Sequence, residues 1–156
     1  MEEVDFGLWK SKTTSRFYAS ALDRIWSEGA VNIPWESGRF KVALFGADYQ
    51  PDWANDKTFA DLEGEIESPN YEMGGKTLPD TRKVMAKGVV SAYAGFVYWP
   101  DLEMPVQYAV IYEDRGDLAD SPLLILHTFE SPTKGSPDDP RGVTLFSSKV
   151  AIWRCH

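Results

Sequence analysis

The spacing of apolar residues changes near Pro34, and this change restricts the chain to folds built mainly from β-strands. Before this point the apolar residues recur with a helical spacing. After it, Phe40, Val42 and Leu44 alternate with their neighbours, which is typical of a half-buried strand. From Gly74 onward the chain continues as short alternating segments separated by turn residues. The sequence therefore predicts a mainly β fold.

The clearest pair of strands lies in the second half of the chain. Residues 106–112 and 123–129 both alternate, and the cluster of turn-forming residues at 113–120 between them predicts an antiparallel hairpin. Residues 131–142 contain no apolar side chain and predict a solvated loop. About seven short strands separated by turns indicate an antiparallel β-sandwich or a small barrel. The other predicted strands are 40–44, 89–94, 95–99, 143–146 and 150–153.

One helix is expected near the N-terminus, over residues 15–28. Phe17, Ala21, Leu22 and Ile25 fall on one face at helical spacing. Ser or Thr residues at 14 and 15 suit the start of a helix, and a glycine at 29 suits its end.

A chain of 156 residues fits a single domain. Residues 1–14 show no periodic pattern and predict either an extended N-terminal arm that carries Phe6, Leu8 and Trp9 or a frayed terminus. We expect residues 15–156 to form one β-rich domain.

The charge of the chain argues against several classes of partner. The net charge of −8 repels phosphate, so we expect neither nucleic-acid binding nor docking on anionic membranes. The densest basic stretch contains only Arg82, Lys83 and Lys87. The single cysteine excludes an internal disulfide, and the acidic first residues predict no signal peptide, which together indicate synthesis in a reducing cytoplasm.

Gly75, Lys76 and Thr77 resemble the end of a phosphate-binding loop, but the resemblance fails on spacing. That loop requires a further glycine where this chain has Asn70, and it must open a helix, which Pro79 prevents. The two glycines at 74 and 75 are better explained as turn residues with positive φ.

Arg115, Gly116 and Asp117 spell a tripeptide known from cell adhesion. All three are also ordinary residues of a turn between strands, and we interpret them in that way.

The sequence predicts no catalytic residue, no metal site and no cofactor. The two histidines are His127, within a strand, and His156, beside Cys155. Neither is paired with a nucleophile, and the further ligands of a Cys–His metal site are missing. Paired carboxylates would suit a glycosidase, which we rank last because a chain with 24 acidic residues produces such pairs by chance. The acidic stretches contain Asp56, Asp61, Glu63, Glu65 and Glu67, and Asp138 and Asp139.

The aromatic residues suit a core, a subunit interface or a sugar-binding surface. The sequence leaves the choice among these three roles open for Trp35, Trp53, Trp99 and Trp153. Our candidate interface residues are Phe6, Leu8, Trp9, Trp53 and Tyr71.

The order of motifs along residues 15–153 resembles a family of small virion structural proteins of tailed bacteriophages. A short helix comes first, and strands with characteristic aromatic and turn residues follow. The residues that carry the resemblance are Lys41, Val42, Ala43, Leu44 and Phe45 with Tyr49, Pro51 and Asp52; Glu67, Tyr71, Gly74, Gly75 and Leu78; Val97 and Trp99; Tyr108, Ala109, Val110, Ile111, Tyr112, Glu113 and Asp114; and Pro122, Leu123, Ile125 and Phe129. The loop at 131–142 is longer and richer in proline than the usual connection.

The resemblance implies a non-enzymatic structural component of a virion, with a capsid decoration protein as the first expectation and a tail, baseplate or neck protein as the alternative. The implied partners are the major capsid protein, other virion proteins and further copies of this chain. A carbohydrate-binding module that uses exposed Trp and Tyr side chains is the expectation from a different functional class.

Overall fold

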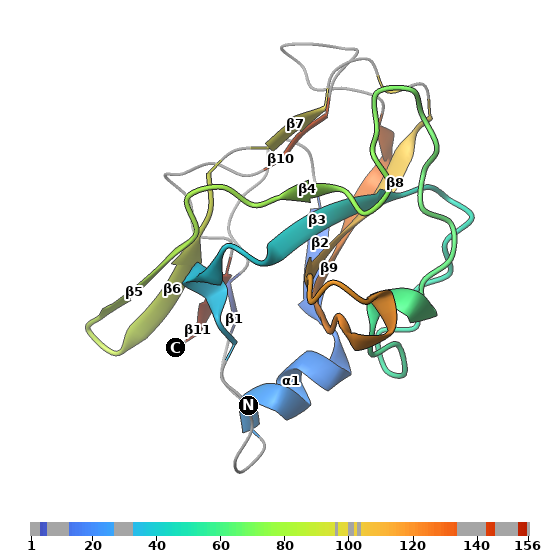
Figure 1. The fold of residues 1–156 in the computed structure, drawn as a ribbon. Helices are drawn as coiled ribbons and strands as arrows, with labels where there is room; N and C mark the ends of the chain where they lie inside the picture. The colour runs from blue at the N-terminus through green and yellow to red at the C-terminus, as the bar shows by residue number, and fades with distance from the viewer. Residues whose placement is uncertain are drawn as a thin grey trace.

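The structure, a computed structural model, describes residues 4–5, 13–26, 33–95, 97–99, 102, 104–133, 143–145 and 153–155. It confirms a mainly β fold with antiparallel sheets and one short N-terminal helix, α1 (Ala19–Trp26) (Figure 1).

A five-stranded antiparallel sheet forms the centre of the molecule. Its order is β2 (Thr13–Phe17), β9 (Leu123–Thr133), β8 (Val106–Glu113), β3 (Phe40–Phe45) and β4 (Lys76–Thr77). The predicted hairpin of β8 and β9 is confirmed. Over the residues that the structure describes, this sheet ends at β2 and at β4, so it is open and does not close into a small barrel.

The remaining strands form two smaller antiparallel groups. One is four-stranded, and the other joins two strands that are far apart in the sequence. The first has the order β1 (Val4–Asp5), β11 (Trp153–Cys155), β6 (Val89–Tyr93) and β5 (Arg82–Ala86), and the second pairs β7 (Val97–Trp99) with β10 (Val143–Leu145).

The helix begins later than predicted, because the first residues of the predicted helix belong to a strand. Strand β2 pairs with β9 over all five of its residues, from Thr13 opposite Phe129 to Phe17 opposite Ile125. The chain then turns at Tyr18, which is fully buried, and α1 starts at Ala19. Phe17 matched the helical spacing but is buried by the strand instead.

Strand β3 is buried on both faces and not on one face as predicted. Val42, Ala43 and Leu44 have no exposed surface. Loop residues cover the strand: the rings of Phe45 and Phe59 lie 6.0 Å apart, and the hydroxyl of Tyr71 accepts a hydrogen bond of 2.9 Å from the backbone N–H of Leu44. Tyr71 thus takes the place of a neighbouring strand beyond the end of β4.

The ends of the chain differ in detail from the prediction. The last strand was expected at 150–153 and is observed at Trp153–Cys155. Residues 131–133 of the predicted loop extend β9, and residues 134–142 lie outside the described part. Within the predicted arm, β1 pairs with β11 of the same chain, and the expected boundary after residue 14 falls inside β2.

Candidate functional site

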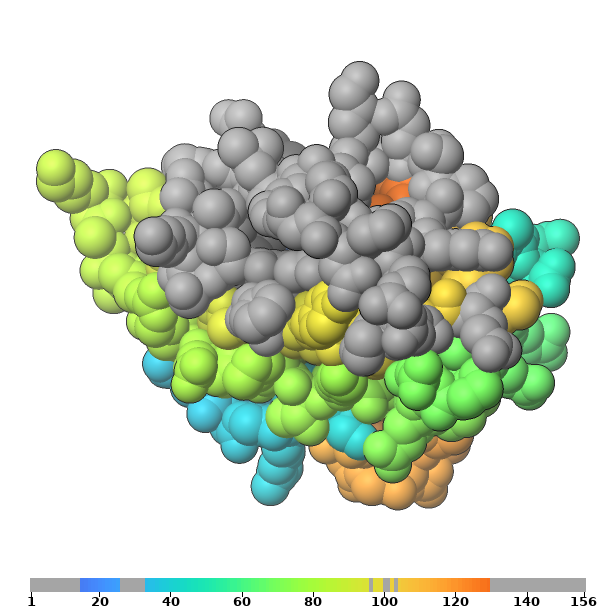
Figure 2. All heavy atoms as spheres, turned by 90° about the horizontal axis from the view of Figure 1, so that it is seen from above, coloured from blue at the N-terminus to red at the C-terminus, as the bar shows by residue number. Residues whose placement is uncertain are grey.

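The four-stranded sheet ends in a hairpin that projects from the rest of the molecule (Figures 1 and 2). We call residues 82–93 the β5–β6 hairpin. Its strands pair from Arg82 opposite Tyr93 to Ala86 opposite Val89. Lys87 and Gly88 join the strands with φ angles of 52° and 77°, the two positive values that a tight two-residue hairpin turn requires. Every residue of β5 is exposed.

The hairpin exposes apolar and basic side chains on both faces of β5. Met85 is 78% exposed, the largest fraction among the large apolar side chains that the structure describes, and Val84, on the opposite face of the strand, is 40% exposed. Lys83 and Met85 lie two residues apart and therefore point to the same face of the strand. The guanidinium of Arg82 lies 4.2 Å from the ring centroid of Tyr93.

The base of the hairpin is fixed to the molecule. The indole N–H of Trp35, in the short 3-10 helix η1 (Trp35–Ser37), donates a hydrogen bond of 3.0 Å to the carbonyl of Tyr93. The carboxylate of Glu36 accepts a hydrogen bond of 3.2 Å from the backbone N–H of Lys83, on the open edge of β5. The hairpin is thus a supported projection, with its turn farthest from the support.

The strand predicted at 89–94 is confirmed as β6 (Val89–Tyr93), but β5 and the turn that joins them are not predicted from the sequence. Basic residues interrupt the apolar residues of β5, so its two-residue pattern is weak. The one signal that points to it is the Lys87-Gly88 pair with Val84 on one side and Val89 on the other.

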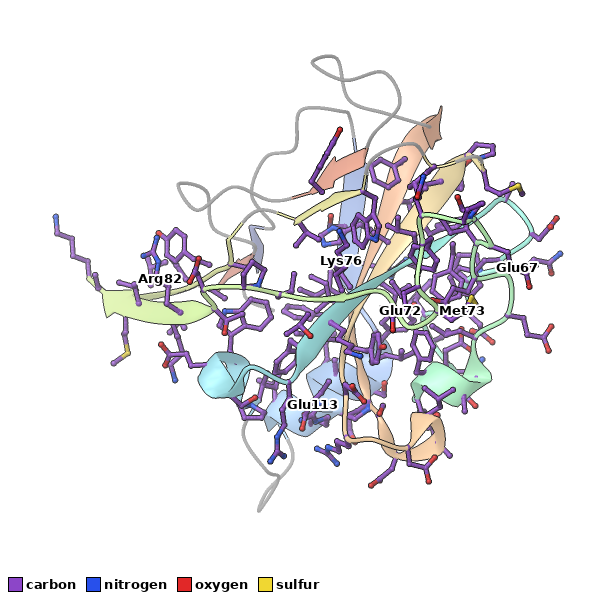
Figure 3. All side chains as sticks on the ribbon, turned by 45° about the horizontal axis from the view of Figure 1, so that its top comes forward. Glu67, Glu72, Met73, Lys76, Arg82 and Glu113 are labelled. Carbon is purple, nitrogen blue, oxygen red and sulfur yellow. The ribbon has the colours of Figure 1, made fainter. Side chains whose placement is uncertain are left out.

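A surface of the opposite charge lies on the other side of the molecule. Residues 47–75 contain eight acidic residues and one basic residue, Lys57. We call the exposed side chains of Glu67, Glu72 and Met73 the acidic face. In Figure 3, Glu67 lies across the molecule from Arg82, and Glu72 and Met73 lie in the same half as Glu67. Met73 is 58% exposed. The other exposed carboxylates of residues 47–75 are Asp48, Asp52, Asp61 and Glu63.

Other carboxylates of the same segment stabilise its loops. Glu65 accepts hydrogen bonds from the hydroxyl of Tyr71 at 2.5 Å and from the N–H of Gly74 at 2.6 Å, and burial raises its pKa. Asp61 accepts from the N–H groups of Thr58 and Lys57, which lower its pKa. The hydrogen bonds of these two carboxylates therefore stabilise the loops, and we do not interpret either carboxylate as part of a substrate site.

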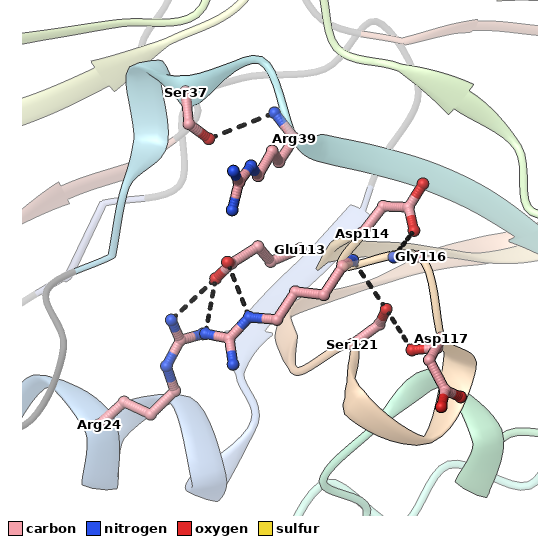
Figure 4. Close-up of polar contacts among 9 residues, drawn as sticks. Arg24, Ser37, Arg39, Glu113, Asp114, Gly116, Asp117 and Ser121 are labelled. Carbon is pink, nitrogen blue, oxygen red and sulfur yellow. Dashed lines mark hydrogen bonds and ion pairs between the residues drawn. The ribbon is translucent and has the colours of Figure 1, made fainter.

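The Arg115-Gly116-Asp117 tripeptide lies in the turn between β8 and β9 (Figure 4). Arg115 donates through Nε to Glu113 at 2.9 Å, and Asp117 accepts from the N–H of Ala119 at 3.0 Å. Arg24 of α1 donates to the other oxygen of Glu113, also at 2.9 Å. Burial raises the pKa of Glu113, but the bonds from the two arginines outweigh it and hold that pKa below its ordinary value. The charged side chains of the tripeptide thus stabilise the turn.

The structure brings a serine and a histidine together, although no nucleophile–base pair was predicted. Ser15 of β2 and His127 of β9 are directly opposite in the strand register, and Oγ of Ser15 contacts Nδ1 of His127. His127 is fully buried, which lowers its pKa to about 3. A general base works best with a pKa near the operating pH, so we interpret this contact as a link between the two strands.

The glycines at 74 and 75 have φ angles of 95° and 81°, which confirms their role in a turn. A Cβ atom at Gly75 would lie 1.9 Å from the carbonyl oxygen of Val42, so this segment is packed against β3. The following residues form β4, and Lys76 donates to the carbonyl of Tyr98 at 2.6 Å. The motif is thus followed by a strand and not by the helix that a phosphate-binding loop requires.

The candidate aromatic residues are divided between the core and the surface. Trp35 and Trp99 are buried. Trp53 is 39% exposed, and the guanidinium of Arg16 lies 3.3 Å from its ring centroid. Tyr71 is only 7% exposed and belongs to the core. Phe6, Leu8, Trp9 and the side chain of Trp153 lie outside the described residues.

The described part of the chain contains no group of three or more Cys, His, Asp or Glu side chains arranged to hold a metal ion. Nor does it contain a helix that is long and apolar enough to cross a membrane.

Comparison with known proteins returns no relative. No protein-family model matches the chain, no curated protein matches it, and no solved structure matches it.

Proposed function

We propose that this protein is a structural component of a larger assembly and acts through contacts between subunits, without catalysing a reaction. The observation that carries the proposal is the projecting β5–β6 hairpin, whose strand β5 exposes Met85 and Val84. Exposed apolar side chains beside charged neighbours, such as Met85 beside Lys83 on one face of β5, are typical of protein contact surfaces. A supported hairpin of this kind suits a fixed contact with a neighbouring subunit.

The sequence resemblance specifies the assembly in this proposal as the virion of a tailed bacteriophage. Within the virion, we propose capsid decoration first and a tail, baseplate or neck position second. The partners in this proposal are the major capsid protein, other virion proteins and further copies of the chain, after synthesis in the host cytoplasm. Phe6, Leu8 and Trp9 remain proposed contact residues.

A carbohydrate-binding module remains the second candidate, and Trp53 is the observation in its favour. Sugar rings stack on exposed aromatic faces, and Trp53 is exposed, but Arg16 already lies over its ring. Because Trp35 and Trp99 are buried, they cannot extend a sugar-binding row from Trp53. Glycan binding that is lost in Trp53→Ala would support this candidate over the first.

Purified particles provide the test of the proposed function. Particles from a phage that carries this gene would be separated on a density gradient and analysed by quantitative mass spectrometry. We expect the protein in the particle fraction at a constant ratio to the major capsid protein, and a reconstruction should show this fold in a repeated position. Its recovery only from the soluble fraction of the lysate would contradict the proposal.

A further inference from the structure

We propose that the β5–β6 hairpin of one copy docks on the acidic face of a second copy, so that molecules associate head to tail. This inference deepens the proposed structural function and rests on it. It assigns the two surfaces that would meet, which a subunit role alone does not specify.

The first argument is charge complementarity within one chain. Residues 81–95 carry three basic residues and no acidic residue, in a protein with a net charge of −8. Residues 47–75 carry eight acidic residues against Lys57 alone. Opposite potentials on two surfaces favour an encounter between them and fix its orientation.

The second argument is that each surface offers an exposed methionine beside its charges. Met85 is 78% exposed with Lys83 on the same face of β5, and Met73 is 58% exposed next to Glu72. A contact that pairs Lys83 with Glu72 would bring the two methionines together. Methionine adapts its shape to an irregular partner, which suits a contact between a strand and a loop.

Charge also decides against the symmetric alternative, in which two hairpins pair with each other. That arrangement would bring Arg82, Lys83 and Lys87 of both copies together, and like charges at an interface are unfavourable. In addition, the carboxylate of Glu36 occupies the backbone N–H of Lys83, which a pairing strand would need. The acidic face is the better partner.

The positions of the two surfaces determine the type of assembly. The hairpin and the acidic face lie on opposite sides of the molecule, as the positions of Arg82 and Glu67 show (Figure 3). When the hairpin of one copy binds the acidic face of another, the pair still has one free hairpin and one free acidic face. Further copies can therefore be added until a ring closes or a filament forms.

The first test measures self-association of the full chain by sedimentation velocity at two salt concentrations. Raising NaCl from about 0.1 M to about 1 M shortens the Debye length from about 10 Å to about 3 Å. We expect association that depends on protein concentration and weakens at least about tenfold at the higher salt. A chain that stays monomeric at low salt and millimolar concentration overturns the inference.

The second test uses a matched pair of variants. Lys83→Glu and Lys57→Glu change the net charge by the same amount, but the first acts on the hairpin and the second within the acidic segment 47–75. We expect Lys83→Glu to weaken association at least about tenfold and Lys57→Glu to leave it equal or stronger. Equal weakening by both would indicate general repulsion and would overturn the inference.

The third test restores the contact with exchanged charges. The double variants Lys83→Glu/Lys87→Glu and Glu67→Lys/Glu72→Lys should each be monomeric, because each places like charges opposite one another where residue 83 meets residue 72. Mixed together they should associate, since the exchanged charges at this contact attract again. If the mixture stays monomeric, the surfaces are wrongly assigned. The proposed structural function has its own test, the presence of the protein in purified particles. A protein that enters particles but does not self-associate would therefore contradict this inference and leave the proposed function intact.

Discussion

His127 couples the stability of the protein to pH through its complete burial. Burial lowers its pKa to about 3, against 6.5 for an exposed histidine. Between these values the unfolded chain binds a proton that the folded chain does not bind, so stability is present above about pH 6.5 and is lost as the pH falls. We expect this residue alone to reduce the free energy of unfolding by about 2 kcal/mol between pH 7 and pH 5.

Urea unfolding at both pH values, with His127→Gln as the reference, checks this prediction. The difference in stability between the two proteins should shrink towards low pH, because other titrating groups affect both equally. In NMR spectra, the imidazole of His127 should show no titration over the same range. A titration near pH 6 would contradict the assignment of a buried, neutral ring.

Glu113 is the second residue whose substitution should strongly affect stability, because it forms ion pairs with two arginines from different parts of the fold. Its side chain is 3% exposed, and it joins Arg24 of α1 to Arg115 of the turn after β8. We expect Glu113→Gln to lower the free energy of unfolding by about 2–3 kcal/mol, since partly buried guanidinium groups lose their charged partner.

The matched control for this change is Asp114→Asn. Asp114 pairs with Lys41 at 3.1 Å, but both side chains are about 30% exposed. An ion pair of this kind contributes about 0–1 kcal/mol. Chemical denaturation of both variants measures the difference, and equal losses would show that burial does not distinguish the two ion pairs.

At the scale of the element, the turn before β4 tolerates no side chain. Gly75 has a φ of 81°, and an added Cβ would lie 1.9 Å from a backbone oxygen of β3. We expect Gly75→Ala to destabilise the protein by at least about 3 kcal/mol, because strain and a backbone clash act together. Gly116→Ala is the control: its φ of 88° is similar, but nothing lies within 4 Å. Thermal unfolding should show that Gly116→Ala lowers the free energy of unfolding by about 1 kcal/mol. Equal losses in the two variants would mean that the structure relieves the clash at residue 75.

The elements that the sequence predicts well are those whose apolar pattern has a single explanation. The hairpin of β8 and β9 alternates clearly and has a cluster of turn residues between its strands. Residues 13–17 were assigned to the helix or the arm because Phe17 fits two spacings, and only the pairing with β9 decides between them. In the β5–β6 hairpin, β6 is predicted correctly, whereas β5 escapes prediction because this exposed strand buries little and no apolar pattern marks it.

At the scale of the whole molecule, the order of the strands predicts where the backbone is most protected. β8 lies between β9 and β3 and is almost entirely buried, whereas β5 is an exposed edge strand. In high salt, where we expect the hairpin to be free, amides of β8 should exchange with deuterium at least about a hundredfold more slowly than the outward-facing amides of β5. Hydrogen–deuterium exchange read by NMR measures both. Equal protection would indicate that β5 is covered by further chain or by another molecule.

The carboxylate of Glu36 on the edge of β5 has a consequence for solubility. An exposed, partly apolar edge strand is a template on which identical chains can stack without limit, as in amyloid fibrils. By occupying the N–H of Lys83, Glu36 removes one of the hydrogen bonds through which a foreign strand would add. Charged residues on the same strand act in the same direction. The hairpin can therefore expose its side chains while its backbone resists uncontrolled polymerisation, even at high protein concentration.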